Sequence, residues 1–235
     1  MSMDFSRFQV LTFDCYGTLI DWESGILGAL RPLLAAHGKT IDDGAILALY
    51  SELEPAIQQE SYRPYRQVLE EVVRALGRRL GFSPTEAEAE SLPYSLRNWL
   101  PFPDTVAALH ALKSRYRLGV ISNIDDDLFA MTAQHLEVPF DFLVTAQQAG
   151  SYKPSTNNFK LALQRIGLPA EKMLHCAESL YHDVAPARSL GLATVWVNRH
   201  AGKSRPSATR KADIRPDLEV PDLKTLAALA LGPSR

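Results

Sequence analysis

Acidic, basic and hydroxyl side chains follow apolar, strand-like stretches at several points of this 235-residue sequence. The first stretch, residues 8–13, ends in the carboxylate of Asp14, and Gly17 indicates a tight turn just behind it. A carboxylate at the end of a buried strand costs free energy unless it is paired or used. Further polar residues follow this turn or later apolar stretches, and with Asp14 they are candidates for a catalytic site: Thr18, Ser122, Asn123, Lys153, Glu178, Ser179 and Asp183.

One lysine among several carboxylates points to nucleophilic chemistry. Lys153 would keep Asp14 ionised, and an ionised, poorly solvated carboxylate can act as a nucleophile. The hydroxyls of Thr18 and Ser122 and the amide of Asn123 can hydrogen-bond an anionic group of a substrate. Taken separately, Ser122 and Asn123 could equally begin a turn, and Lys153 could lie in a solvated loop. The prediction therefore rests on their joint occurrence.

Two acids late in the chain have more than one possible role. Glu178 and Asp183 could orient Lys153, position a water molecule, or hold a divalent cation together with Asp14. They could also be surface acids near the start of a helix, where the helix dipole favours negative charge. The residue types leave these options open.

The elements that must position these residues form an α/β pattern with a helical insertion. From Asp104 onward, helical and strand-like segments alternate, which is typical of βαβ units in a parallel sheet. Residues from about 24 to 96 show helical periodicity without a clear strand. The carboxyl ends of parallel strands share one edge, where ligands bind, so the candidate residues should meet there. We predict a core of residues 1–19 and 98–235 and a helical cap of residues 20–97.

Composition narrows the possible function classes. The formal net charge of −2 gives no general affinity for nucleic acid or anionic membranes, and we interpret the basic segment 203–211 as a solvated loop. There is no apolar signal segment and no run long enough to span a bilayer. Two cysteines, Cys15 and Cys176, make no disulfide framework. We expect a cytoplasmic protein without nucleic-acid or membrane partners.

The motifs around the candidate residues resemble those of the haloacid dehalogenase superfamily of hydrolases. FDCYGTL matches the first motif, VISN the second, SYKP the third and AESLYHD the fourth, in order and with suitable spacing. The resemblance covers essentially the whole chain. It implies a Rossmann-like (flavodoxin-like) parallel sheet with an inserted all-helical cap. It also implies that Asp14 forms a covalent aspartyl intermediate, that Lys153 neutralises it, and that Ser122 binds the substrate anion.

The residue type at position 16 distinguishes between branches of this superfamily. Its phosphatases usually carry a second aspartate two positions after the nucleophile, where this chain has Tyr16. A phenol, with an unperturbed pKa of about 10, is a poor replacement at neutral pH. The pattern resembles L-2-haloacid dehalogenases, in which the nucleophile displaces a substituent next to the substrate carboxylate and water hydrolyses the ester without a metal. This implies a small anionic carboxylate as substrate, contacted by Tyr16, Ser122 and Asn123.

The residues at the positions that recognise the leaving group differ from those of L-2-haloacid dehalogenases. Dehalogenases cradle the halide with an arginine of the cap, whereas Ser51 stands at the aligned position, so Arg63 and Arg66 are the candidates to replace it. Phe159 and Leu180 stand where a tyrosine and an asparagine are expected. The chain looks closest to the azetidine-2-carboxylate hydrolase type of relative, in which the leaving group is an amine.

A magnesium-dependent phosphatase of the same superfamily is the alternative. Glu178 keeps an acid that phosphatases have, and Asp14, Tyr16, Glu178 and Asp183 would then surround Mg²⁺; the leading interpretation requires no cofactor. A catalytically idle scaffold is a third hypothesis, which the retention of Asp14, Lys153 and Asp183 disfavours. An exposed apolar face of the cap could also support a homodimer.

Overall fold

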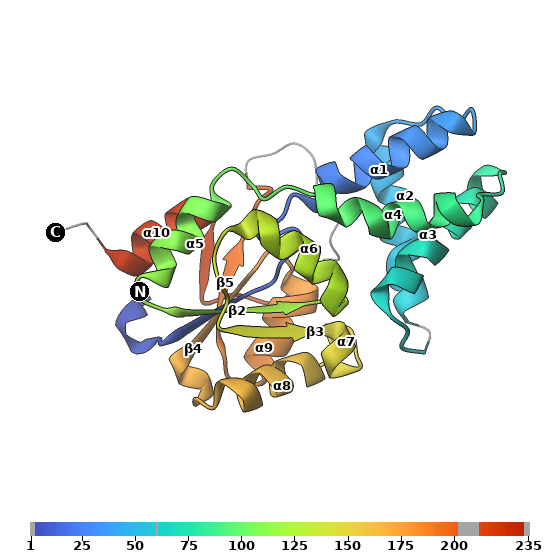
Figure 1. Cartoon of the computed structure of the whole chain (residues 1–235). Helices are drawn as coiled ribbons and strands as arrows, with labels where there is room; N and C mark the ends of the chain where they lie inside the picture. The colour runs from blue at the N-terminus through green and yellow to red at the C-terminus, as the bar shows by residue number, and fades with distance from the viewer. Residues whose placement is uncertain (1–2, 60, 202–211, 233–235) are drawn as a thin grey trace.

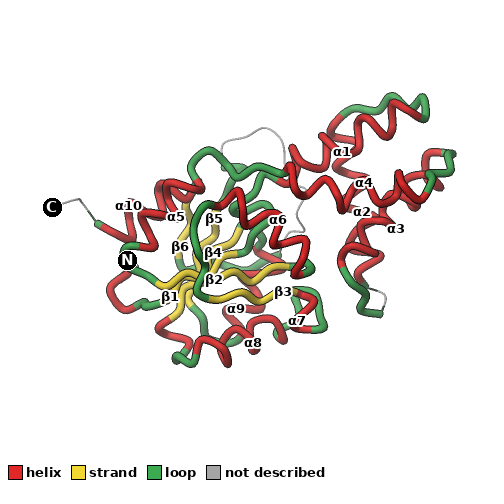
Figure 2. Tube along the Cα trace, in the orientation of Figure 1, coloured by secondary structure: helices red, strands yellow, loops and turns green. Residues whose placement is uncertain are grey.

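The computed structural model describes residues 3–59, 61–201 and 212–232, so the basic segment 203–211 lies outside the described residues. In the described residues six strands form one sheet of order β3-β2-β1-β4-β5-β6, in which all neighbours are parallel (Figures 1 and 2). The strands are β1 (Val10–Phe13), β2 (Arg117–Ser122), β3 (Phe142–Thr145), β4 (Met173–Ala177), β5 (Ala193–Val197) and β6 (Leu218–Val220). The predicted Rossmann-like parallel sheet is therefore confirmed. Its order is that of the doubly wound Rossmann sheet and not the 2-1-3-4-5 order of flavodoxin.

Helices cover both faces of this sheet because successive strand residues point to opposite sides. Leu11 and Phe13 belong to the larger apolar cluster, to which helices α5 (Thr105–Lys113), α6 (Asp126–Leu136) and α10 (Leu223–Leu231) contribute. Val10 belongs to a second cluster with residues of α8 (Asn157–Ile166) and α9 (Ala185–Ser189). The remaining short helices are η1 (Phe5–Arg7), η2 (Leu96–Asn98), α7 (Ala146–Ala149), η3 (Ala170–Lys172) and η4 (Leu180–Val184).

Helices α1 (Trp22–Ala36), α2 (Asp43–Gln58), α3 (Tyr65–Leu80) and α4 (Glu86–Ser95) pack on one another beside the sheet (Figure 1). Pro55 lies inside α2 without ending it. Helix α4 begins at Glu86 because Thr85 and Glu88 form a reciprocal capping box. Among the described residues, no helix is long and apolar enough to cross a membrane.

The chain leaves the sheet for these helices and returns at nearly the same point. Ile20 and Pro101 form an antiparallel bridge. The backbone N–H of Asp21 donates to the carbonyl of Leu100 (2.9 Å), and the N–H of Phe102 donates to the carbonyl of Leu19 (3.0 Å). We propose that residues 20–97 form a cap that hinges on these paired connections.

Candidate active site

Asp14 lies at the carboxyl end of β1, next to β4, where the strand order reverses direction. This is the position at which open α/β sheets bind ligands. The backbone N–H of Asp14 still donates to the carbonyl of Cys176 (3.1 Å), so the residue is fixed by the sheet ladder. Its side chain is nearly buried, with 7% of the residue's surface exposed. The sheet therefore presents one poorly solvated carboxylate at its ligand-binding edge.

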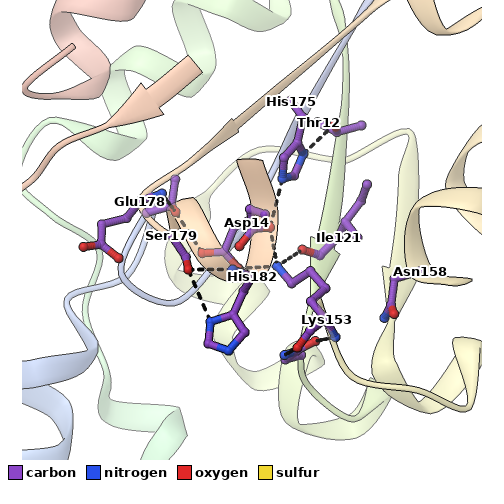
Figure 3. A network of polar contacts seen from close by, with 12 residues as sticks. Thr12, Asp14, Ile121, Lys153, Asn158, His175, Glu178, Ser179 and His182 are labelled. Atoms are coloured by element: carbon purple, nitrogen blue, oxygen red, sulfur yellow. Dashed lines mark hydrogen bonds and ion pairs between the residues drawn. The ribbon is translucent and has the colours of Figure 1, made fainter. Parts of the chain in front are cut away.

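The ammonium of Lys153 lies between two carboxylates (Figure 3). Its Nζ donates to Oδ1 of Asp14 (2.8 Å), to Oδ1 of Asp183 (2.7 Å) and to the backbone carbonyl of Ile121 (2.8 Å). These contacts use all the N–H groups of an ammonium. The structure thus brings together Asp14, Lys153 and Asp183, which the sequence predicted as one site.

The charges of these groups depend on one another. Burial raises the pKa of Asp14, against the opposing attraction of Lys153. Burial alone would lower the pKa of Lys153, but Asp14 and Asp183 outweigh it and the pKa is raised. Burial would likewise raise the pKa of Asp183, but Lys153 and His175 outweigh it and lower the pKa. The negative charge of Asp183 is thus well compensated by its neighbours. The charge of Asp14 is compensated only in part, as expected of a reactive nucleophile.

His175 supports Asp183 from inside the sheet and was not predicted as a site residue. Its Nε2 lies 2.9 Å from Oδ1 of Asp183, and its Nδ1 lies 2.9 Å from Oγ1 of Thr12 (Figure 3). An ionised carboxylate only accepts hydrogen bonds, so Nε2 is the donor. Thr12 and His175 are cross-strand partners of β1 and β4. Only the strand register would have shown this link in advance.

Thr18, Ser122 and Asn123 make different contacts around this centre. The hydroxyl of Thr18 donates to Oδ2 of Asp14 (2.8 Å) and accepts from the backbone N–H of Glu178 (2.9 Å). Ser122 lines the cavity, and its buried hydroxyl has no hydrogen-bond partner. The amide of Asn123 binds the backbone N–H and carbonyl of Lys153 at 2.7 and 3.1 Å. The hydroxyl of Ser122 thus remains available for a hydrogen bond, whereas Asn123 positions the lysine loop.

A cavity of about 120 Å³ opens over these residues and is walled on the other side by the helices of the insertion. Sequence reasoning missed most of that wall, which consists of Tyr50, Ser51, Glu54, Pro55, Gln58, Tyr65, Leu96 and Trp99. Tyr16 and Trp22, which also line the cavity, pack against Trp99 and Tyr50 with ring centroids 5.8 and 5.7 Å apart. Aromatic residues on amphipathic helices usually signal only packing, so the sequence offered little to single them out.

The structure does not bring Arg63 or Arg66 to this cavity. Neither residue lines it in the described structure. The guanidinium of Arg66 pairs with Asp127 at the surface (2.6 Å), and the backbone carbonyl of Arg63 accepts from the hydroxyl of Tyr152 (2.8 Å). The two arginines predicted to replace a halide-binding cap residue are therefore not placed to do so.

The predicted magnesium ligands do not form a metal-binding group. Among the residues that the structure describes, no cluster of three or more His, Cys, Asp or Glu side chains could hold a metal ion. The hydroxyl of Tyr16 contacts that of Thr132 (2.7 Å), and burial raises its pKa well above its ordinary value. A neutral phenol engaged in this way is a poor Mg²⁺ ligand. Asp14, Glu178 and Asp183 line the cavity, but they share it with the ammonium of Lys153.

Comparison with known proteins agrees with the motifs and the sheet. The family model for haloacid dehalogenase-like hydrolases matches residues 8–191. An (S)-2-haloacid dehalogenase of Pseudomonas putida is 28% identical over 195 residues, which is 80% of this chain and 85% of that protein. A glyceraldehyde 3-phosphate phosphatase of Methanothermobacter thermautotrophicus is also 28% identical, over 208 residues covering 81% and 85% of the two chains.

A solved structure extends this similarity to the three-dimensional arrangement. The L-2-haloacid dehalogenase PA0810 superposes with a TM-score of 0.81 at 28% identity. The match covers 96% of this chain and 100% of that one, so it includes the insertion as well as the sheet. Together with the family-model match over most of the chain, these similarities show that the protein belongs to the haloacid dehalogenase-like hydrolases.

Proposed function

We propose that this hydrolase acts on a small 2-substituted carboxylic acid through covalent catalysis by Asp14. The observation that carries the proposal is the buried ammonium of Lys153, which donates to Asp14 at the floor of the cavity while Asp183 anchors the lysine. Thr18 fixes the second oxygen of Asp14 and leaves the first near Lys153. The similarity to several 2-haloacid dehalogenases supports the same substrate class.

The chemistry takes two displacements. An oxygen of Asp14 forms a bond to C2 of the substrate, and the bond from C2 to the leaving group breaks with its electron pair on that group. Water then adds to the ester carbonyl of Asp14, and the ester C–O bond to Asp14 breaks. The 2-hydroxy acid leaves with one oxygen of the Asp14 carboxylate and one proton of the water. The oxygen of the water stays on Asp14, and its second proton goes to solvent or to a basic leaving group such as an amine. The hydroxyl of Ser122 would bind the substrate carboxylate, and Lys153 would stabilise Asp14 before attack and after release.

The leaving group need not be a halide. Residues of the described chain that line the cavity include no arginine, and Ser51 occupies the wall with a buried hydroxyl that has no partner. The absence of a cationic group on that wall supports a non-halide leaving group such as the amine of L-azetidine-2-carboxylate. The side chains that make up this site supply nucleophile, anchor and hydroxyl donors without a metal, so we propose that no cofactor is required.

A magnesium-dependent phosphatase is the second candidate. Glu178 lines the cavity beside Asp14, and one relative is a glyceraldehyde 3-phosphate phosphatase. Tyr16 argues against it, because a buried phenol of raised pKa cannot serve as the general acid for an alcohol leaving group near neutral pH.

Chelator-treated protein separates these candidates. After EDTA and metal are removed, the protein is incubated with L-2-chloropropionate or L-azetidine-2-carboxylate, and chloride or ring-opened product is measured against Asp14→Asn. Asp14-dependent turnover of either acid supports the proposal. Turnover of phosphate esters that needs Mg²⁺, with no activity on either acid, would replace it with the phosphatase. Ring opening without chloride release would also identify the leaving group.

A further inference from the structure

Glu54 is a carboxyl group on the cavity wall that has no cationic partner. It lies on α2 and accepts hydrogen bonds from the hydroxyl of Tyr65 (3.0 Å) and from the side-chain amide of Gln58. No Lys, Arg or His of the described residues forms an ion pair with it. Burial raises its pKa to about 7, against the opposing hydrogen bond from Tyr65. A buried carboxylate without a cationic partner lowers the free energy of unfolding unless a ligand pairs with its charge.

The charge balance of the cavity favours a cationic ligand group. Among the described residues, its lining includes the carboxyl groups of Asp14, Glu54 and Asp183 and one lysine, Lys153. That lysine already donates to Asp14 and Asp183. An anionic leaving group on the side of the cavity formed by α2 would be repelled by the negative charge of Glu54, whereas an ammonium would be attracted to it.

Aromatic residues lie on the same wall as Glu54. The hydroxyls of Tyr50 and Tyr65 lie 3.1 Å apart, so Tyr65 can accept from Tyr50 while it donates to Glu54. Trp22 packs against Tyr50, with ring centroids 5.7 Å apart. A carboxylate beside aromatic residues suits an ammonium group, which the charge of the carboxylate attracts.

We propose that Glu54 binds a protonated amine of the substrate, so that the acid taken by this site is zwitterionic. The inference rests on the proposed function for the other half of the ligand, the carboxylate that Ser122 would bind. In this arrangement the ammonium lies against α2, and the carboxylate and the reacting carbon lie at the carboxyl ends of the strands. Substrates whose leaving group is a halide lack the partner that Glu54 requires.

The charge of Glu54 gives the binding a characteristic pH dependence. Below about pH 7 Glu54 gains a proton, so affinity for an ammonium-bearing acid should fall as the pH falls. Affinity for an uncharged analogue should not fall in this way. The described titratable groups that face Glu54 are Tyr50, Tyr65 and Tyr152 nearby, and Asp14, Tyr16, Lys153, Glu178, His182 and Asp183 across the cavity. Because His182 and other charged groups share the cavity, the Glu54→Gln variant is needed to assign the effect.

Binding to the inactive Asp14→Asn protein tests the proposal without turnover. L-azetidine-2-carboxylate and cyclobutanecarboxylate have the same ring size, but only the first carries an ammonium. Calorimetry should show the azetidine acid binding about tenfold or more tightly, the range expected for a hydrogen bond to a charged group. Glu54→Gln keeps an oxygen for Tyr65 and should abolish the preference and its pH dependence. Glu52→Gln, an exposed acid of the same helix, should change neither.

Specific outcomes would overturn the proposal. They are equal or weaker binding of the azetidine acid, no detectable binding of it, or a preference that survives in Glu54→Gln. The proposed function fails separately. A Glu54-dependent preference without Asp14-dependent turnover of any acid would refute the displacement chemistry and leave this assignment standing, whereas chloride release without the preference would do the reverse.

Discussion

At the scale of single residues, Asp14 and Asp183 are two buried carboxylates with opposite effects on stability. The raised pKa of Asp14 means that the folded state binds its proton more tightly than the unfolded chain does. That contribution is present below the unfolded pKa and is lost as the pH rises through the folded pKa. The lowered pKa of Asp183 has the opposite sign, so its contribution is present at neutral pH and is lost on acidification.

Substituting each carboxylate by its amide tests this contrast. At pH 7, Asp14→Asn should abolish turnover while the free energy of unfolding stays equal or rises. Asp183→Asn should lower the free energy of unfolding by about 3–5 kcal/mol, because Lys153 and His175 lose their anionic partner. Urea denaturation and initial rates measure both, with mass spectrometry to exclude deamidation. A destabilised Asp14→Asn protein, or an unaffected Asp183→Asn protein, would contradict the assignment.

Ser122 gives a second prediction at this scale. Its buried hydroxyl has no partner in the protein, so Ser122→Ala should leave the free energy of unfolding within about 0.5 kcal/mol of wild type. If the hydroxyl binds the substrate carboxylate, kcat/KM should fall by about tenfold or more, since a hydrogen bond to a charged group is lost. Thr18→Ala is the comparison: Thr18 supports both Asp14 and the N–H of Glu178, so that variant should lose stability as well. An unchanged kcat/KM in Ser122→Ala would exclude the proposed contact.

At the scale of elements, Asp125 links the sheet to the insertion by capping a helix that is distant in sequence. The first residue before α3 is Pro64, which offers no side-chain cap. Both carboxylate oxygens of Asp125 instead accept from α3, from the backbone N–H of Tyr65 (2.9 Å) and of Arg66 (2.8 Å). Asp125 is buried and precedes α6, whose own N-terminus it does not cap.

Removing this cap should weaken both stability and substrate binding. Asp125→Ala should lower the free energy of unfolding by about 1–2 kcal/mol, the usual cost of a lost helix cap. Because Tyr65 lines the cavity, KM should rise as well. Asp127→Ala removes the exposed pair with Arg66 and a local hydrogen bond from the N–H of Leu128, and should change the unfolding free energy by less than about 0.5 kcal/mol. Equal effects of the two variants would rule out the capping role.

The elements also show what sequence could and could not predict. Asp14, Lys153 and Asp183 were predictable because each follows a strand, and parallel strands bring such positions to one edge. Glu54 was not, because its chemistry arises from helices α2 and α3 packing over the sheet edge, and a helical pattern does not say what its face covers. Asp125 could not be recognised as a cap for α3, since the two lie 60 residues apart. Strand β6 could not be predicted, because its three residues carry little periodicity.

At the scale of the whole molecule, one apolar cluster joins the sheet to the insertion. It includes Leu11 and Phe13 of β1, Ile20 at the connection, and Leu69 and Leu76 of α3. A contiguous core favours cooperative unfolding, because neither part can open without exposing apolar surface of the other.

We therefore expect α2 and α3 to open with the same free energy as β1 and β4. Native-state hydrogen exchange in increasing urea, followed by mass spectrometry of peptides from each element, measures this directly. Exchange of α2 and α3 through an opening several kcal/mol cheaper than that of β1 would show that the two parts unfold separately. Cooperative opening has a consequence for the site, whose wall carries Glu54 and whose floor carries Asp14. Substrate entry would then require rigid movement about the paired connections at Ile20 and Pro101, because local unfolding of the helices would cost as much as unfolding the sheet.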